Sequence, residues 1–247
     1  MDKKKLYKLS TQIHKWAGIT IGIQVFLWIV GGLYMSWFPI EDVRGEHLRK
    51  TMEPVVISEN TFNMKALETF IANSPTPIRS ASADSQFGEP IFRVRYVDGK
   101  TVILDPKTAT SLSPVDAAYI NKVAQKIYDG TATTHTAQLV NEAGPNYKGP
   151  FPVWQVHFDD EEGSVFYFSA DTGALRAVRT NLWRTYDFMW MLHIMDYKNR
   201  SDFNSPLLII FSLAALIFTI TGFVLVFFRF TKNDFKWLGV GRSRRGR

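Results

Sequence analysis

Two long runs of uncharged, mostly apolar residues dominate the pattern of the chain. They cover residues 17–38 and 206–228, and neither contains Asp, Glu, Lys or Arg. A helix rises about 1.5 Å per residue, so each run exceeds the roughly 30 Å hydrocarbon thickness of a bilayer. We therefore predict two transmembrane helices. A cleaved signal peptide is disfavoured, because the first run has full spanning length and no small-x-small cleavage site follows it.

The polar segment between the runs, residues 39–205, repeats one order of patterns: a helix followed by an antiparallel hairpin. In the first copy we expect a helix at residues 64–72 and strands at residues 91–97 and 101–105, joined at Asp98-Gly99. Asp105 then opens a turn that ends at Ala109. Residues 74–90 form the preceding loop.

The second copy follows the same plan. We expect a helix from Pro114 to about Tyr128, strands at residues 153–158 and 164–169, and a further strand at residues 175–178. A turn from Asp171 to Ala174 matches the one that ends the first copy. Residues 130–152 form a loop. Two such units predict α+β layers, with helices packed on antiparallel sheet.

Net charge +6 becomes informative when it is divided by segment. Residues 1–16 hold five basic and one acidic side chain, residues 229–247 hold seven and one, and residues 39–205 hold 17 and 21. Basic charge beside the spans is the positive-inside pattern, so both termini are expected in the cytoplasm and residues 39–205 outside. The charge therefore does not indicate a nucleic-acid partner.

The chain contains no cysteine, which excludes thiol catalysis, iron–sulfur clusters, thiolate zinc sites and disulfides. It also contains no P-loop, dinucleotide-binding glycine pattern, His-Glu-x-x-His sequence or nucleophile elbow. A redox role therefore needs a bound cofactor held by other side chains, and an electron donor outside the chain.

Three further segments carry a resemblance to a known family. They are the sequence His14-Lys15-Trp16-Ala17-Gly18, residues 39–47 after the first span, and residues 183–197 before the second. Together with the duplicated helix-hairpin pattern, they make nearly the whole chain similar to the PepSY-associated transmembrane family. Among its short, two-span members, the chain most resembles proteins that assist ferrous iron uptake by reducing iron.

The resemblance implies a fold and an activity. The fold is membrane α+β, with two transmembrane helices flanking a periplasmic domain of two tandem PepSY-like repeats. The activity is that of a bacterial inner-membrane ferric reductase that carries haem b and passes electrons to ferric iron or a ferric chelate. A ferrous iron transporter is the expected partner, and the electron donor stays open.

Two spans give only two faces around a haem, whereas a four-helix bundle encloses one and supplies ligands from facing helices. We therefore expect a homodimer in the lipid bilayer. The expected segments are a cytoplasmic tail and helix start at residues 1–16, a span at residues 17–38, the periplasmic domain at residues 39–205, a span at residues 206–228 and a basic cytoplasmic tail at residues 229–247.

His14 is the first candidate haem ligand. Gly18 and Gly22 follow it at i+4 and i+8, so the three residues share one helix face and leave a flat strip beside the imidazole. A porphyrin ring that lies against a helix needs such a strip. The alternative is that the glycines form a helix-packing motif and His14 is a polar interfacial residue. Ser10 is a candidate N-cap for this helix.

His193 is the second candidate, in an interfacial helix predicted at residues 181–197. Met189 and Trp190 lie on its helical face, and Arg184, with Arg179, is a candidate partner for haem propionates. Axial ligation by His is usual in electron-transfer haems. The alternative is that the aromatic residues of this segment only anchor it at the membrane boundary.

The other histidines are weaker candidates. His47 lies nine residues after the first span, where it either caps a solvated loop or folds back to pair with His193. His157 is expected at an exposed strand position, and His135 in a loop. Residues 159–162 are all acidic and are expected to form a solvated hairpin tip.

Haem-dependent ferric reduction is the first functional hypothesis, with electron transfer in place of acid–base chemistry. The second is a membrane-tethered PepSY binding module without catalysis, because exposed sheet edges accept added strands. A third is an accessory subunit of a partner transporter.

Overall fold

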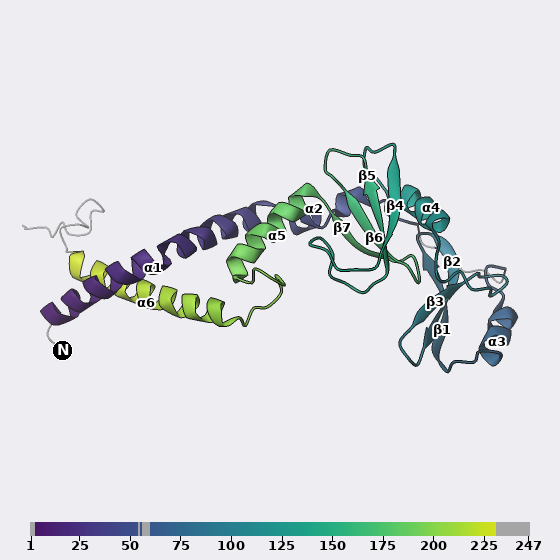
Figure 1. Cartoon of the computed structure of the whole chain (residues 1–247), viewed down its shortest axis with the longest axis horizontal. Coiled ribbons are helices and arrows are strands. Elements are labelled where there is room, and N and C mark those ends of the chain that lie inside the picture. Colours follow the sequence, from purple (N-terminus) through teal and green to yellow (C-terminus); the bar gives the residue numbers. More distant parts are fainter. Residues whose placement is uncertain (1–2, 54, 56–59, 231–247) are drawn as a thin grey trace, which may run out of the picture. The chain divides into compact units, whose positions relative to one another are not determined.

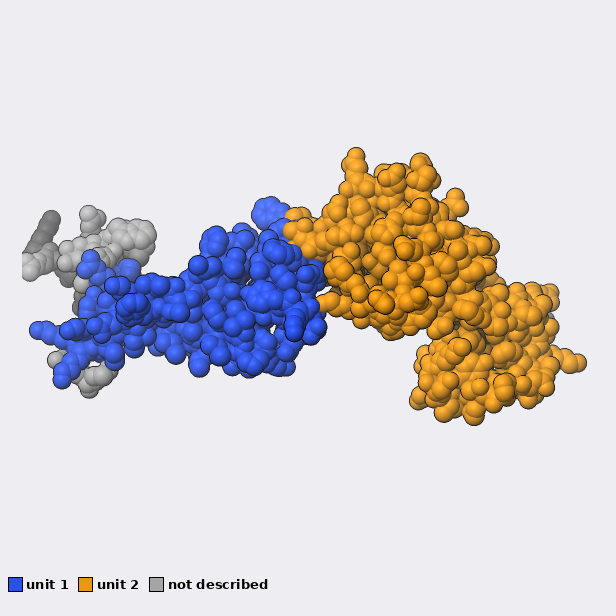
Figure 2. All heavy atoms as spheres, in the orientation of Figure 1, with its two compact units in different colours: residues 1–37, 187–247 blue, residues 38–186 orange. Residues whose placement is uncertain are grey.

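The computed structural model describes residues 3–53, 55 and 60–230, which form two compact units. The first unit contains the chain up to residue 37 and from residue 187 onward, and the second contains residues 38–186 (Figure 2). The long helices belong to the first unit and the sheets to the second. Of the predicted tail at residues 229–247, only Arg229 and Phe230 lie within the described residues.

Helices α1 (Lys3–Trp37) and α6 (Pro206–Arg229) lie side by side in the first unit (Figure 1). Both are long and apolar enough to cross a membrane. Their large apolar side chains point outward, as Ile23 (77% exposed) and Phe227 (79% exposed) illustrate. Polar Ser10, Gln24 and Thr221 are buried instead. Apolar outside and polar inside is the arrangement that suits a lipid environment.

Helix α1 begins earlier than expected, so the prediction of Ser10 as its N-cap is wrong. The helix starts at Lys3, and Ser10 lies within it, only 4% exposed. Packing against the end of α6 explains the extension, because the Tyr7 and Phe228 rings meet edge-on at 5.8 Å. Helix α6 itself starts as its sequence predicts, with Ser205 as N-cap and Pro206 in the first turn.

Helix α5 (Asn181–Ile194) begins in the second unit and continues into the first. It stops three residues before the predicted end at residue 197, because Met195 adopts a left-handed conformation with φ 55°. The Asp196 carboxylate then accepts backbone hydrogen bonds from Ser201, Asn199, Asp202 and Lys198. These bonds hold the pKa of Asp196 well below its ordinary value and fix the connection to α6.

The second unit opens with the short helix α2 (Ile40–Val43) and the 3-10 turn η1 (Glu46–Leu48). Helix α3 (Met64–Ala72), capped by Asn63, precedes a three-stranded antiparallel sheet. Its strands are β1 (Ile78–Gln86), β2 (Glu89–Tyr96) and β3 (Thr101–Leu104), in that order. Leu67 of α3 packs on the face of this sheet that carries Phe92 and Leu104.

Helix α4 (Ala117–Ile127), capped by Asp116, precedes a four-stranded antiparallel sheet. Its strands are β4 (His135–Val140), β5 (Val153–Phe158), β6 (Val165–Ser169) and β7 (Leu175–Arg179), in that order. Ile120 of α4 packs with Phe166 and Val156 of this sheet, and with Ile103 from the opposite face of the first sheet. One core therefore joins both sheets.

Two strands lie where the sequence predicted loops. Strand β1 occupies most of residues 74–90, and β4 lies within residues 130–152, so the loop assignments there, including that of His135, are wrong. Both are edge strands made mostly of small and polar residues, whose own β-propensity is low. Their pairing with β2 and β5 supplies the stability that the sequence pattern does not show.

The predicted membrane α+β class is confirmed at the level of two apolar helices and antiparallel sheets. Helix α3 and strand β5 match their predicted bounds residue for residue. The tandem PepSY-like repeats and the four-helix homodimer stay predictions.

Candidate functional site

His14 packs against α6 through one of its two ring nitrogens. Nδ1 lies 3.0 Å from the carbonyl oxygen of Phe218 and 3.2 Å from the hydroxyl of Thr221. The imidazole stacks on the Phe218 ring at 4.0 Å between centroids and 10° between planes. Both the position and the plane of the His14 ring are therefore set by one turn of α6.

These contacts also select the tautomer of His14. A carbonyl oxygen only accepts, so His14 Nδ1 must donate to Phe218. The Thr221 hydroxyl donates to the carbonyl oxygens of Phe218 and Ile217, and so its oxygen is free to accept from the same Nδ1–H. In the neutral imidazole the lone pair then lies on Nε2, for which no hydrogen-bond partner occurs among the described residues.

Two residues of α6 in this contact escaped the sequence analysis. Thr221 supplies the hydroxyl, and Gly222 supplies the space, because a Cβ there would lie 3.1 Å from His14 Cε1. A polar residue beside a glycine within an apolar span is a signal that could have drawn attention to them. Without the fold, nothing in the sequence connects them to His14.

The two glycines predicted to flank a haem differ in their surroundings. A Cβ on Gly18 would lie 3.1 Å from the Phe218 ring, so Gly18 lets α6 approach α1. A Cβ on Gly22 would meet nothing within 4 Å. Gly18 thus makes the close contact expected of helix packing, whereas no described atom lies within 4 Å of that position at Gly22; the cofactor-binding roles predicted for both glycines stay predictions.

His193 lies at the end of α5 and is held through its backbone. The indole Nε1 of Trp28 donates to the His193 carbonyl oxygen at 2.8 Å, and Gln24 Nε2 donates to the Leu192 carbonyl oxygen at 3.0 Å. These two α1 side chains satisfy carbonyls that the end of a helix leaves open. The His193 ring lies 6.4 Å from the Trp28 ring, and its buried Nδ1 has no partner among the described residues.

His14 and His193, the two histidines of the first unit, lie at different levels. Trp28, which contacts His193, follows His14 by fourteen residues in α1, equivalent to about 21 Å along the helix. Nitrogen ligands bind a transition metal at about 2 Å, so two of them on one ion lie about 4 Å apart. Within the first unit, each level therefore has one imidazole, and His14 and His193 do not share an ion.

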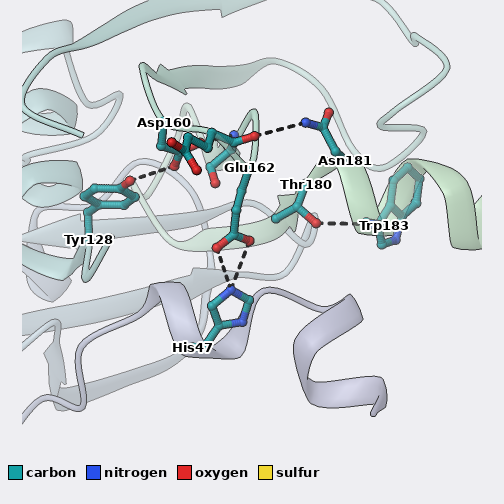
Figure 3. A network of polar contacts seen from close by, with 9 residues as sticks. His47, Tyr128, Asp160, Glu162, Thr180, Asn181 and Trp183 are labelled. Carbon is teal, nitrogen blue, oxygen red and sulfur yellow. Dashed lines mark hydrogen bonds and ion pairs between the residues drawn. The ribbon is translucent and has the colours of Figure 1, made fainter. Parts of the chain in front are cut away.

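His47 lies in the second unit, in a polar network around the β5–β6 turn (Figure 3). Its Nε2 lies 3.0 and 3.1 Å from the two carboxylate oxygens of Glu162. In the same turn, Tyr128 donates to Asp160 at 2.6 Å. Residues 159–162 thus form the predicted hairpin tip, but two of its carboxylates have specific partners.

The Tyr128–Asp160 hydrogen bond contributes to a shift in the pKa of both groups. Burial, reinforced by the hydrogen bond to Asp160, raises the pKa of Tyr128 to about 12. Burial alone would raise the pKa of Asp160, but hydrogen bonds from Tyr128, Ser164 and Gly163 outweigh it and lower that pKa. At neutral pH the pair is therefore a neutral phenol and a carboxylate, which is a structural anchor for the turn.

Arg184 belongs to the same turn. Both of its terminal nitrogens donate to the Gly163 carbonyl oxygen at 3.1 Å, and one also donates to Asn181 Oδ1 at 2.9 Å. The neighbouring Arg179 stacks on the Trp183 ring at 3.9 Å. The proposed role of Arg184 toward haem propionates stays a prediction.

Among the described residues, no three His, Asp or Glu side chains gather as a metal site. His14 and His193 belong to the first unit and His47 to the second, and the ligand roles predicted for all three stay predictions. His157 occupies an exposed position on β5, as its strand pattern predicted.

Comparison with known proteins places the chain in a family. A family model described as the PepSY-associated TM region matches residues 11–247. No curated protein and no solved structure matches the chain. The match covers α1 from residue 11 onward, all of α6 and the whole sheet-containing segment between them. The chain is therefore a membrane protein that belongs to the PepSY-associated transmembrane family.

Proposed function

We propose that this protein is an inner-membrane b-type haem protein that reduces ferric iron or a ferric chelate in the periplasm and so supports ferrous iron uptake. The observation that carries the proposal is His14, whose contact with Phe218 leaves the Nε2 lone pair open. Iron-ligating histidines are commonly oriented in this way, by donating the other ring N–H to a backbone carbonyl.

The residues present fit haem b. His14 supplies an oriented imidazole, and Gly22, around which no described atom would lie within 4 Å of an added Cβ, follows two helical turns further along α1. The buried, unpartnered Nδ1 of His193 is a polar atom that nothing in the described chain explains. When bound, haem iron supplies reversible one-electron transfer.

The protein has three tasks in this proposal. Phe218 and Thr221 hold the His14 ring in one orientation and one tautomer. Trp28 and Gln24 hold the end of α5, and with it the backbone of His193. The outward apolar surfaces of α1 and α6 keep water from both levels once lipid covers them.

Because each chain offers one imidazole at each level, a second copy would supply the facing ligand. A homodimer would place two His14 side chains at the cytoplasmic level and leave His193 at the periplasmic level. Electrons would then pass from a donor on the cytoplasmic side to one ferric ion at a time outside. Each ferric ion takes one electron to become ferrous.

The orientation rests on the basic residues beside the spans. Reporter fusions at Arg247 and within residues 130–150 test it. Both termini are expected in the cytoplasm, and a cytoplasmic signal from the internal fusion would contradict the direction of electron flow.

A binding module without catalysis is the second candidate. The observation that favours it is that β1, β4 and β7 are terminal in their sheets, each with a neighbouring strand on one side only among the described residues. Edge strands of this kind accept an added strand from a partner. Such a module would have no need of the oriented His14 imidazole, which is why we rank it second.

The test of the proposed reaction compares membranes that contain equal amounts of the wild-type chain, His193→Ala, His47→Ala and His157→Ala. We expect His193→Ala to lose reduction of a ferric chelate, and the exposed His157→Ala to retain it. Normal reduction in both His193→Ala and His47→Ala would refute an outer histidine-ligated centre. Loss in His47→Ala alone would move that centre to His47.

A further inference from the structure

A positively charged groove lies in the second unit, between the chain around η1 and strand β7. Its cavity measures about 240 Å³ and is lined by Arg44, Arg49, Arg176 and Arg179, with Glu46 as the single acidic residue. It shares Glu46 and Arg49 with an adjoining cavity of about 590 Å³ that Lys50 also lines. We call the two cavities together the arginine groove.

The arginine groove is positively charged, whereas the segment that contains it carries a net negative charge. Residues 39–205 carry more acidic than basic side chains, 21 against 17. The smaller cavity nevertheless collects four arginines and one glutamate. A positive cleft with low-dielectric walls attracts and concentrates anions.

Some of these arginines are already engaged. Arg49 lies 3.7 Å from Glu46, and Arg179 donates to the Asn146 carbonyl oxygen while it stacks on Trp183. The side chains of Arg44 and Arg176 form no hydrogen bond or ion pair with the residues that the structure describes. These two exposed guanidinium groups, one on each wall, leave their charge for a ligand.

A close backbone contact fixes the walls of the arginine groove. Gly45, between Arg44 and Glu46, has φ 66°, and a Cβ there would lie 2.6 Å from Val178 Cγ1 on β7. Glycine is therefore required for the chain to pack this tightly against the strand. Arg44 directly precedes Gly45, and Arg176 lies two positions before Val178, at the bulge where β7 shifts register against β6; both arginines line the same cavity.

We propose that the arginine groove binds a carboxylate-rich anion, and that this anion is an anionic chelate of ferric iron. The planar guanidinium group pairs with carboxylates through two parallel hydrogen bonds, which suits a ligand that presents several carboxylates. The identification of the ligand as the substrate rests on the proposed function. The binding site itself rests only on the groove.

The test uses gallium(III) citrate, a redox-inert stand-in for ferric citrate, with the full-length protein in detergent and calorimetric titration. We expect Arg44→Gln with Arg176→Gln to weaken binding about tenfold. Arg79→Gln with Arg95→Gln removes the same charge from exposed positions outside the groove and should bind as wild type does. A neutral gallium hydroxamate should bind at least tenfold more weakly than the citrate complex.

Each outcome bears on one claim. Equal binding of gallium citrate by the wild type and the groove variant would overturn the site. Equal binding of the neutral hydroxamate would overturn the preference for anions. Tighter binding of inorganic phosphate or of citrate alone than of the gallium complex would overturn its assignment to a metal chelate. Because no electron moves in this titration, a protein without haem would leave the result intact while it refuted the proposed function.

Discussion

His14 of α1 and His193 of α5, the two histidines of the first unit, are held in opposite ways. At the His14 level, α6 contacts the imidazole itself, through the Phe218 carbonyl, the Phe218 ring and the Thr221 hydroxyl. At the His193 level, α1 contacts the backbone, through Trp28, and the ring nitrogen Nδ1 is buried without a partner. The His14 ring is therefore oriented before any ligand binds. At His193 only the backbone carbonyl is held, and the ring nitrogen Nδ1 has no hydrogen-bond partner among the described residues.

This difference bears on what each level does. An imidazole with a fixed tautomer loses little entropy when it ligates a metal, which favours tight, permanent ligation at His14. A buried imidazole nitrogen without a partner is costly, and a ligand or a second copy of the chain would relieve that cost at His193. We therefore expect variants at the His14 level to have the larger effects on haem content.

The largest expected effect is loss of the haem held at the His14 level in His14→Ala. The change removes the oriented imidazole of that level and leaves the apolar surfaces of α1 and α6 intact. Haem content, measured by the pyridine haemochrome assay, should fall by about one haem per two chains. His157→Ala, which removes an exposed histidine of the second unit, should retain wild-type content. Full haem content in His14→Ala would assign the ligand elsewhere.

The next largest effect is expected from Trp28→Phe, which tests the His193 level. It removes the indole donor of the His193 carbonyl while an aromatic ring stays in place. We expect a loss of about 1 kcal/mol in stability and a shift in the reduced-minus-oxidised spectrum, with haem retained at His14. The matched control is Trp16→Phe, because Trp16 is 66% exposed on the same helix. An unchanged spectrum in Trp28→Phe would contradict the link between this tryptophan and the outer level.

Thr221→Val should have a smaller effect of the same kind at the His14 level. Valine keeps the shape of threonine but removes the hydroxyl that lies 3.2 Å from His14 Nδ1, while the Phe218 carbonyl still accepts from it. We expect haem binding to weaken about threefold to tenfold. Thr221→Ser should restore it. Thr219→Val, which alters an exposed threonine two residues away, should behave as wild type; equal losses at both positions would indicate a general effect on α6.

The smallest effect is expected from His47→Ala. His47 contacts the carboxylate of Glu162, and both side chains are nearly half exposed. Removal of such a pair costs less than about 1 kcal/mol. Thermal unfolding of the full chain should change little, and haem content should not change. A loss of haem comparable to that of His14→Ala would bring His47 into the haem site.

Helices and strands with a clear pattern of apolar and polar residues could be predicted from the sequence. The apolar runs of α1 and α6, the amphipathic helices α3 and α4 and the apolar strands such as β5 are all visible in it. Strands β1 and β4 are not, because their stability comes from neighbouring strands rather than from their own residues. Edge strands of small polar residues carry little local pattern.

The same limit applies to the candidate site. His14 and His193 are recognisable from residue type and position alone. Their partners are not, because Thr221 lies 207 residues from His14, and Trp28 lies 165 residues from His193. Only the packing of α6 and α5 on α1 brings these side chains together. Residue type thus predicts the candidate ligands, and the fold supplies the groups that hold the His14 ring and the His193 backbone.

The most direct test of the central claim is the haem content of the purified wild-type chain after expression with sufficient haem. The account predicts a red preparation with a Soret band, and at least one haem per two chains by the pyridine haemochrome assay, held by His14. A folded but colourless protein, with no haem detected by that assay, would contradict it.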